Sequence, residues 1–514
     1  MVQTSENNKR IAKNTLVLYL RMFFTMLVSL YTSRIVLATL GEEDFGIYNV
    51  VGGVVAMFSF INMAMSASTQ RYLTFELGKG NFENLRKVFC TSIHIHALIS
   101  LIIVILAETI GLWFLYNKMT IPEARMDAAF WVYQLSVLSS VVMIMSVPYN
   151  ASIVANEKMS AFAYISILEV LSRLVIVYLL LIWDFDKLKF YALLVFLVQV
   201  GIRIVYGAYC KRHFPETQYR WIWDGRLFKE MLGFASWNLW GNCAAVAFTQ
   251  GLNLLLNMFF GPIVNAARAI AVQVQNAVNM FAANFQTAVN PQITKSYATQ
   301  DYEYMHTLIF KSSKFTFFLL WMLCLPIMLE ANSILELWLK KVPDYTAVFL
   351  CLILCVTMID GMANSLMVAA SSTGRVKLYQ GVVGGILLCI LPISYLVLKL
   401  GGNPPSVFVV HLCVCILAFI VRLLIIRPMI HLSLSHYFKS VLLPCMLVVA
   451  VSLLLPIGIR LALPENFWSF LLVCIASVLS VLLTTYFCGL SITERQFVGN
   501  KLQVMRKRIR GGKN

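Results

Sequence analysis

Long apolar runs separated by short polar segments dominate this chain, and their lengths predict membrane-spanning helices. About 20 apolar residues cross a bilayer as a helix. Roughly fourteen runs approach that length, near residues 14–38, 45–66, 88–116, 128–150, 161–183, 188–209, 231–259, 265–290, 311–333, 346–370, 379–399, 406–426, 440–461 and 467–487. An outer-membrane barrel would instead show alternating strands of about 10 residues. We therefore expect an all-α polytopic membrane protein with about 14 transmembrane helices.

Two neighbouring runs carry polar residues at helical spacing. Intervals of four and seven residues separate Asn238, Asn242, Thr249 and Asn253 in the first run, and Arg268, Gln275, Asn279, Gln286 and Asn290 in the second. A lone amide in a membrane usually holds two helices together, and an unpaired buried amide costs about 1–3 kcal/mol. A water-filled cavity would supply hydrogen-bond partners to every residue of such a stripe. We favour cavity lining over helix attachment, with Asn242, Asn253, Gln275, Asn279 and Gln286 binding sugar hydroxyls, because amides both donate and accept.

Composition places the chain in the membrane class. Of its 514 residues, 60% are hydrophobic and 13% are charged, against about 25% charged in soluble domains. The segments between runs are too short for a soluble catalytic domain, and no GxxxxGK[ST] nucleotide loop occurs. The 12 cysteines include no CxxC pair and are expected to pack within helices. We expect no enzyme activity, no cofactor and no metal.

The formal net charge of +17 is distributed unevenly along the chain. If the N-terminus is inside, most of the 41 Lys and Arg residues fall in inner segments. The outer loops then hold only Lys118, Arg125, Lys187, Lys189, Lys340 and Lys341. By the positive-inside rule, both termini are cytoplasmic. The basic inner face would also attract anionic lipid headgroups, and no nucleic acid partner is expected.

Ionisable residues inside membrane helices are candidates for function. Arginines outnumber carboxylates there. The runs contain or border Arg21, Arg34, Arg173, Arg203, Arg268 and Arg422, against Glu108, Glu169 and Asp360, with Glu330 near a helix end. Glu169 and Arg173 lie four residues apart, so a structural ion pair is the alternative for them. Since guanidinium groups suit bidentate binding of phosphate, the excess predicts an anionic substrate.

Arg71 begins the first inner loop, which is amphipathic and basic. Two interpretations are open for it. One is packing at the membrane interface, and the other is capture of a lipid-linked phosphate.

A weak internal repeat divides the chain. The segment TLGEEDFGIYNVVGGVV from Thr39 aligns with FFGPIVNAARAIAVQV from Phe259, which places Gly41 on Gly261 and Gly46 on Ala266. Chance similarity between apolar helices is the alternative. The repeat predicts a six-helix bundle over 1–225, a second over 226–438, and a helix pair with a basic tail over 439–514. Repeats of this kind are typical of secondary transporters.

The segment YTSRIVLATLGEEDFGIYNVVGGVVAMFSFIN, continued by STQRYLTFELGKGN, resembles bacterial polysaccharide flippases of the multidrug/oligosaccharidyl-lipid/polysaccharide exporter superfamily. The most recognisable part is the turn formed by Leu40, Gly41, Asp44, Phe45, Gly46 and Tyr48. The resemblance implies two six-helix bundles around a central cavity, with two extra helices. It also implies that the protein moves undecaprenyl-pyrophosphate-linked oligosaccharide units across the bacterial inner membrane by alternating access, in O-antigen, capsule, exopolysaccharide or lipopolysaccharide biosynthesis.

The resemblance further implies cationic residues in the cavity. Matching positions are Arg21, Arg34 and Arg268, with Arg71 at the first inner loop. Asp360 or Glu169 could couple transport to a proton or sodium ion, and membrane lipids and other polysaccharide assembly proteins are possible partners. The alternative in the same superfamily is a cation-coupled drug or metabolite antiporter. Drug exporters often use a carboxylate in the first helix, which this chain lacks, and the arginine excess disfavours a cationic substrate.

Overall fold

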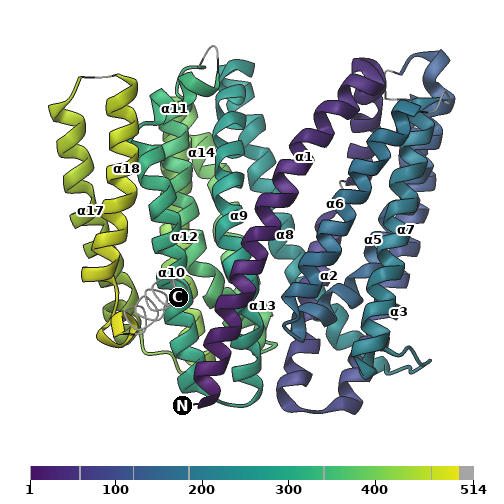
Figure 1. Cartoon of the computed structure of the whole chain (residues 1–514), viewed down its shortest axis with the longest axis horizontal. Coiled ribbons are helices and arrows are strands. Elements are labelled where there is room, and N and C mark those ends of the chain that lie inside the picture. Colours follow the sequence, from purple (N-terminus) through teal and green to yellow (C-terminus); the bar gives the residue numbers. More distant parts are fainter. Residues whose placement is uncertain are drawn as a thin grey trace, which may run out of the picture. The chain divides into compact units, whose positions relative to one another are not determined.

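A computed structural model describes residues 2–56, 59–117, 119, 121–182, 186–339, 342–464 and 466–496. Within these ranges, the side chains of residues 2–9, 30, 33–34, 37, 42–43, 49–50, 52–56, 59–63 and 262 are not described. The described residues form helices and no strand, which confirms the predicted all-α class (Figure 1).

The first half of the chain contains α1 (Val2–Ala56), α2 (Ser59–Lys79), α3 (Phe82–Leu106), η1 (Ala107–Gly111), α4 (Leu112–Asn117), η2 (Glu123–Arg125), α5 (Met126–Ala155), α6 (Met159–Ile182), α7 (Lys187–His213), η3 (Pro215–Thr217) and α8 (Gly225–Phe260). The second half contains α9 (Pro262–Ala298), α10 (Tyr302–Leu329), α11 (Ala331–Trp338), α12 (Thr346–Ser372), α13 (Val376–Leu388), α14 (Ile390–Lys399), α15 (Pro404–Ile430), α16 (Leu434–Tyr437), η4 (Phe438–Leu442), α17 (Leu443–Ala462), α18 (Phe467–Thr484) and η5 (Thr485–Gly489).

Twelve helical segments of the described chain are long and apolar enough to cross a membrane. Two of the expected runs are not among them. The run at 45–66 falls partly on residues that the structure does not describe. The run at 265–290 lies in α9, which has 37 residues and therefore sufficient length. Its amides and Arg268 reduce its apolar content.

Glycine turns separate the first two helices of each predicted repeat. Gly41 has a φ of 79° where α1 kinks, and Gly261 has a φ of 78° between α8 and α9. Left-handed backbone of this kind favours glycine, because a Cβ atom would crowd the following carbonyl. The two aligned glycines therefore have the same local geometry, which supports the weak sequence repeat.

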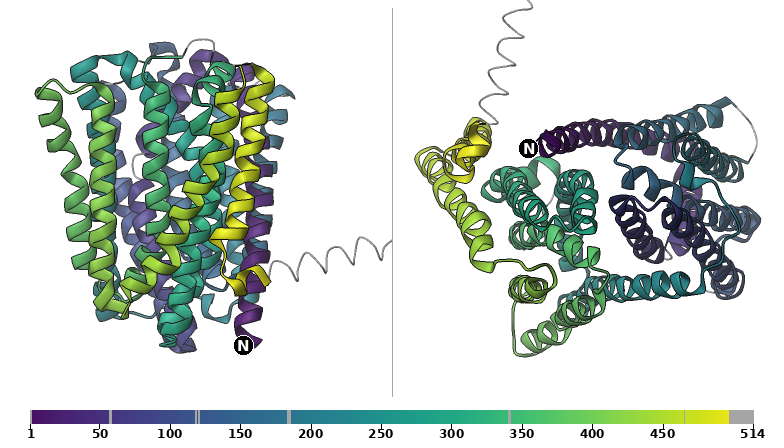
Figure 2. Two further views of the ribbon diagram at one scale, coloured as in Figure 1. Left: turned by 90° about the vertical axis from the view of Figure 1, so that its left-hand side faces the viewer. Right: turned by 90° about the horizontal axis from the view of Figure 1, so that it is seen from below.

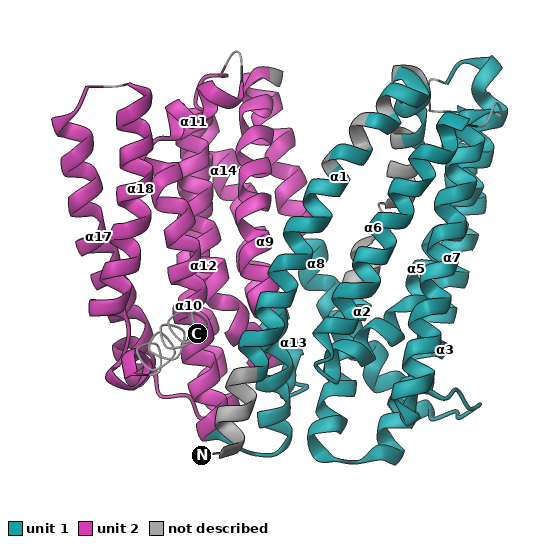
Figure 3. Ribbon diagram, in the orientation of Figure 1, with its two compact units in different colours: residues 1–244, 287–302, 371–381 teal, residues 245–286, 303–370, 382–514 magenta. Residues whose placement is uncertain are grey.

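The chain divides into two compact units (Figure 3). Unit 1 comprises residues 1–244, 287–302 and 371–381, and unit 2 comprises residues 245–286, 303–370 and 382–514. The ends of α9 and α12 thus pack with unit 1, although most of each helix belongs to unit 2. The sequence-based boundaries after residues 225 and 438 stay a prediction.

Unit 1 is built around α5, which contacts α1, α2, α3, α6 and α7. One part of its core joins α2, α3 and α5 to the start of α8, through buried residues such as Leu73, Phe89 and Phe234. A second part joins α1, α5 and α7, where Val51, Val132 and Leu188 are fully buried. These apolar clusters fix the helix ends that carry the charged contacts described below.

In unit 2, α17 and α18 lie side by side (Figure 2). One hydrogen bond attaches this pair to α10, and another joins its two helices. The Trp321 indole Nε1 donates to Ser452 Oγ at 2.9 Å, and Ser480 Oγ donates to the Ser452 carbonyl at 2.9 Å. Hydrogen bonds of this kind help to associate helices in lipid, where hydrophobic burial contributes little.

Candidate functional site

Arg268 on α9 is the most deeply buried of the singled-out arginines whose side chains the structure describes, and 6% of it is exposed. Its Nη1 donates to Asn253 Oδ1 and its Nη2 donates to the Thr249 carbonyl at 3.0 Å, both on α8. Its Nε is buried without a hydrogen-bond partner in the described chain. No described carboxylate forms an ion pair with it, so neutral acceptors hold a full positive charge, as an anion site requires.

His411 and Asp360 are two further candidate groups of unit 2. His411 on α15 interacts electrostatically with Arg268, and the His411 ring is 5.2 Å from the Phe248 ring on α8. Asp360 on α12, a predicted ion-coupling residue, lies 3.5 Å from Arg422 Nη1 on α15. The carboxylate of Asp360 is therefore paired with Arg422.

Some residues of the amide stripes form hydrogen bonds between helices. Gln275 Nε2 donates to Thr357 Oγ1 at 3.0 Å, and Gln286 Nε2 donates to the Gly361 carbonyl at 3.0 Å. Both bonds tie α9 to α12. Asn279 is exposed and Asn242 is partly exposed. Gln275 and Gln286 thus act as the helix-attachment interpretation requires, and a sugar-binding role for the stripes stays a prediction.

Arg71 on α2 caps the C-terminus of α12 in unit 1. Its Nη2 donates to the Ser372 carbonyl at 2.9 Å, where the helix dipole is negative. The guanidinium carbon lies 4.8 Å from the centre of the Phe75 ring and 5.5 Å from that of Phe234. Gly374 has a φ of 77°, and a Cβ atom there would lie 2.9 Å from Arg71 Nη2. The protein therefore gives Arg71 a packed structural environment, and phosphate capture stays a prediction.

The remaining predicted residues lie elsewhere in unit 1. Arg21 on α1 stacks over the Phe162 ring of α6 at 4.9 Å. Glu169 accepts a bond from Arg173 Nη2 at 2.8 Å, which is the helical ion pair that the spacing allowed, and one from Gln199 at 3.3 Å. The side chain of Arg34 lies outside the described part of the chain.

A buried carboxylate that sequence reasoning missed connects three segments of unit 1. Glu157 lies in the turn between α5 and α6, and its side chain is fully buried. It accepts bonds from Arg10 Nε at 2.8 Å, Gln292 Nε2 at 2.6 Å and Lys295 Nζ at 2.5 Å. Asn14 Nδ2 also donates to the Glu157 carbonyl at 3.1 Å. The start of α1 and the end of α9 are thereby fastened to this one turn.

Asp44, from the turn that carries the resemblance, belongs to a second charged cluster in unit 1. Arg125 Nε donates to Asp44 Oδ1 at 2.8 Å, and its Nη2 forms an ion pair with the other oxygen. Arg125 Nη1 donates to Asp186 at 2.9 Å. Although burial acts in the opposite direction, backbone N–H donors and Arg125 lower the pKa of the Asp186 carboxyl. The cluster ties three interhelical segments together.

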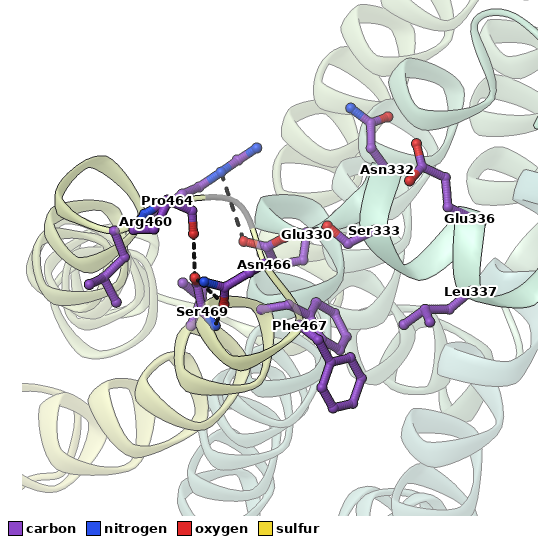
Figure 4. A pocket seen from close by; sticks show the side chains of 13 residues that line it. Glu330, Asn332, Ser333, Glu336, Leu337, Arg460, Pro464, Asn466, Phe467 and Ser469 are labelled. Carbon is purple, nitrogen blue, oxygen red and sulfur yellow. Dashed lines mark hydrogen bonds and ion pairs between the residues drawn. The ribbon is translucent and has the colours of Figure 1, made fainter.

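A polar cavity of about 520 Å³ opens in unit 2 among α11, the end of α17 and the start of α18. Figure 4 shows Glu330 between Ser333 and Arg460. The Glu330 carboxylate accepts from Ser333 Oγ at 2.8 Å and lies 3.8 Å from Arg460 Nε. Asn466 caps α18 at the same place, because its Oδ1 accepts from the Ser469 N–H at 2.8 Å.

Nothing in the described chain is arranged as a metal centre. No group of three or more His, Cys, Asp or Glu residues there could hold an ion, and all twelve cysteines are free thiols.

Comparison with known proteins agrees with this helical architecture. The profile of the MatE family matches residues 18–179. A crystal structure of MATE in the bent conformation has a TM-score of 0.71 at 14% identity, covering 84% of this chain and 97% of that one. The Vibrio cholerae MATE transporter VcmN in the bent form has a TM-score of 0.68 at 16% identity, covering 84% and 98%.

A third similar structure is the outward-facing conformation of a multidrug resistance MATE family transporter of the MOP superfamily. Its TM-score is 0.69 at 15% identity, and the match covers 83% of this chain and 96% of that one. The chain has the MATE transporter fold. No curated protein matches it. The MATE fold agrees with the resemblance at the level of the superfamily.

Proposed function

We propose that this chain is a secondary transporter that moves its substrate across a membrane by alternating access. The MATE fold supports this proposal, since the similar solved structures include an outward-facing, a bent and a straight form. The twelve apolar spans and the short segments between them suit transport rather than catalysis.

The comparisons favour a cation-coupled drug or metabolite antiporter, because one similar structure is described as a multidrug resistance transporter. In this proposal Asp360 and Glu169 are the coupling groups. Each lies beside an arginine, at 3.5 Å and 2.8 Å respectively. Protonation of either carboxylate would remove that attraction and so link proton binding to helix packing.

The chemistry around Arg268 favours a second candidate, a flippase for undecaprenyl-pyrophosphate-linked oligosaccharides of the bacterial inner membrane. A buried guanidinium with only neutral acceptors described around it, and with an unpaired N–H, attracts an anion and repels a cationic drug. We propose that Arg268 binds the pyrophosphate, and substrate contacts by Arg21, Arg34 and Arg71 stay predictions from the sequence. Exposed amides such as Asn279 would hydrogen-bond the sugars. On this observation we take the lipid-linked glycan as the substrate to test first.

Purified protein in proteoliposomes separates the two candidates. One set of vesicles would contain an undecaprenyl-pyrophosphate-linked oligosaccharide, and the other a fluorescent cationic drug, each with an imposed proton or sodium gradient. Glycan transfer without drug exchange supports the flippase. Drug exchange without glycan transfer supports the antiporter, and failure of both under either gradient contradicts the proposed transport activity.

A further inference from the structure

A second cavity in unit 2 has a basic lining and lies at the opposite end of α17 and α18 from the cavity in Figure 4. Its volume is about 410 Å³. Its lining residues come from the first part of α10, from η4 and the start of α17, and from η5 and the residues that follow it. Under the predicted orientation, this end of the unit faces the cytoplasm.

The charge of this cavity is positive. Three lysines line it, Lys311, Lys314 and Lys439, together with His436 and a single carboxylate, Glu494. With His436 neutral, three positive charges and one negative charge leave a net charge of +2. The lining therefore attracts a group with more than one negative oxygen.

One oxygen of the carboxylate, Glu494 Oε2, already accepts two hydrogen bonds. Lys314 is 6% exposed, and its Nζ donates to Glu494 at 2.7 Å, while the Ser491 N–H donates to the same carboxylate at 2.8 Å. Although burial acts in the opposite direction, these bonds lower the pKa of Glu494, which keeps it ionised at neutral pH. Lys311 and Lys439 form no ion pair within the described chain, so their charges are available to a ligand.

The backbone around the cavity is unusual, which is a second and independent observation. Lys439 and Ser440 lie in the π-helical turn η4, and Cys488 and Gly489 lie in the π-helical turn η5. Single π-helical turns are rare and occur often at functional sites. A Cβ atom at position 489 would lie 2.6 Å from the Phe318 ring. Glycine at position 489 therefore allows the η5 backbone to pack closely against Phe318 at the wall of the cavity.

We propose that this cavity binds a phosphate group, carried by an anionic phospholipid or free in solution. Lys311 and Lys439 supply the charge, and the hydroxyls of Thr307, Ser440 and Ser491 lie in the same lining. Phe438 and Leu443 are 48% and 41% exposed beside η4, and acyl chains could cover these apolar side chains. Basic pockets between membrane helices on the cytoplasmic side are suited to anionic headgroups. This site is independent of the transported substrate.

Native mass spectrometry of the purified full-length protein tests the proposal with three probes: phosphatidylglycerol, phosphatidylcholine and inorganic phosphate. The pocket variant is Lys311→Gln with Lys439→Gln. The matched control is Lys211→Gln with Lys229→Gln, which removes the same charge from exposed lysines of unit 1. A charge-preserving variant, Lys311→Arg with Lys439→Arg, separates loss of charge from loss of folding.

We expect wild type to bind phosphatidylglycerol at least tenfold more tightly than phosphatidylcholine. The pocket variant should bind it about 10- to 30-fold more weakly, since each lysine near a membrane surface contributes about one kcal/mol, whereas the control and the arginine variant should stay within about threefold of wild type. If only inorganic phosphate binds in a way that depends on Lys311 and Lys439, the cavity is a phosphate site whose ligand is soluble and not a lipid. Equal weakening in pocket and control variants, or no preference among the probes, overturns the proposal.

Discussion

At the scale of single residues, Arg268 gives the candidate site its positive charge. Its guanidinium is held by Asn253 and by the Thr249 carbonyl, and neither partner carries a charge. The sequence predicted that this arginine begins a polar stripe. It could not show that α8 would supply the acceptors, because a helical pattern fixes the face of a residue and not the neighbour that covers the face.

The first prediction concerns anion binding by Arg268. Arg268→Gln should weaken the binding of inorganic pyrophosphate to the purified protein by about 10- to 100-fold, because a hydrogen bond to a charged group contributes about 1.5–3 kcal/mol. Arg268→Lys keeps the charge and should lose less, since lysine lacks the planar set of donors. Isothermal titration calorimetry measures both. Unchanged affinity in Arg268→Gln would remove this residue from the site.

Glu157 carries the second prediction, which is about stability. Glu157→Gln should lower the free energy of unfolding of the protein by about 3 kcal/mol, since removal of one partner from a buried ion pair leaves the other charge uncompensated. Thermal unfolding in detergent would show the loss as a lower Tm. The matched control is Glu83→Gln, because Glu83 is exposed and pairs only with Lys87 along one helix. That variant should change stability little, and an equal effect of the two substitutions would contradict a special role for Glu157.

At the scale of elements, the helices and the glycine turns could be predicted because their causes are local. Apolar runs fix the helices, and left-handed backbone at Gly41 and Gly261 fixes the turns. The clusters around Glu157 and Asp44 could not be predicted. Glu157 meets Asn14, Gln292 and Lys295 at sequence separations of 143, 135 and 138 residues, and no pattern along one helix encodes such a meeting.

The third prediction concerns the cluster of Asp44, Arg125 and Asp186. Asp44→Asn should lower stability by about 1–3 kcal/mol at neutral pH, because charge-assisted bonds to Arg125 are lost. The pKa of Asp186 is lowered in the folded protein, so its stabilising contribution is present above the unfolded pKa of about 3.9 and disappears as the pH falls through the lower folded value.

Unfolding followed from pH 7 to acid checks this account of the cluster. The stability difference between wild type and Asp186→Asn should shrink as the Asp186 carboxyl becomes protonated. Glu83→Gln again serves as the control with little expected effect. A difference that stays constant down to acid pH would show that Asp186 acts through packing and not through its charge.

At the scale of the whole molecule, the fold does not define the substrate. The likeness to MATE transporters covers 84% of the chain at 14% identity, so it defines the path of the backbone and not the ligand. The sequence predicted the all-α membrane architecture because composition and run length are properties of the entire chain. The substrate depends on a few side chains. In the proposed function, the positive charge of Arg268, which only neutral acceptors of the described chain contact, favours an anionic substrate.

Leaflet-resolved flipping in proteoliposomes tests this central claim most directly. The measured quantity is the fraction of undecaprenyl-pyrophosphate-linked oligosaccharide that becomes accessible to a sugar-modifying enzyme outside the vesicles, for wild type, Arg268→Ala and the exposed-surface control Lys229→Gln. We predict transfer by wild type and by the control, and at least a tenfold slower rate for Arg268→Ala. Equal transfer by all three proteins would contradict the assigned role of Arg268, and no transfer by wild type under either ion gradient would contradict the flippase itself.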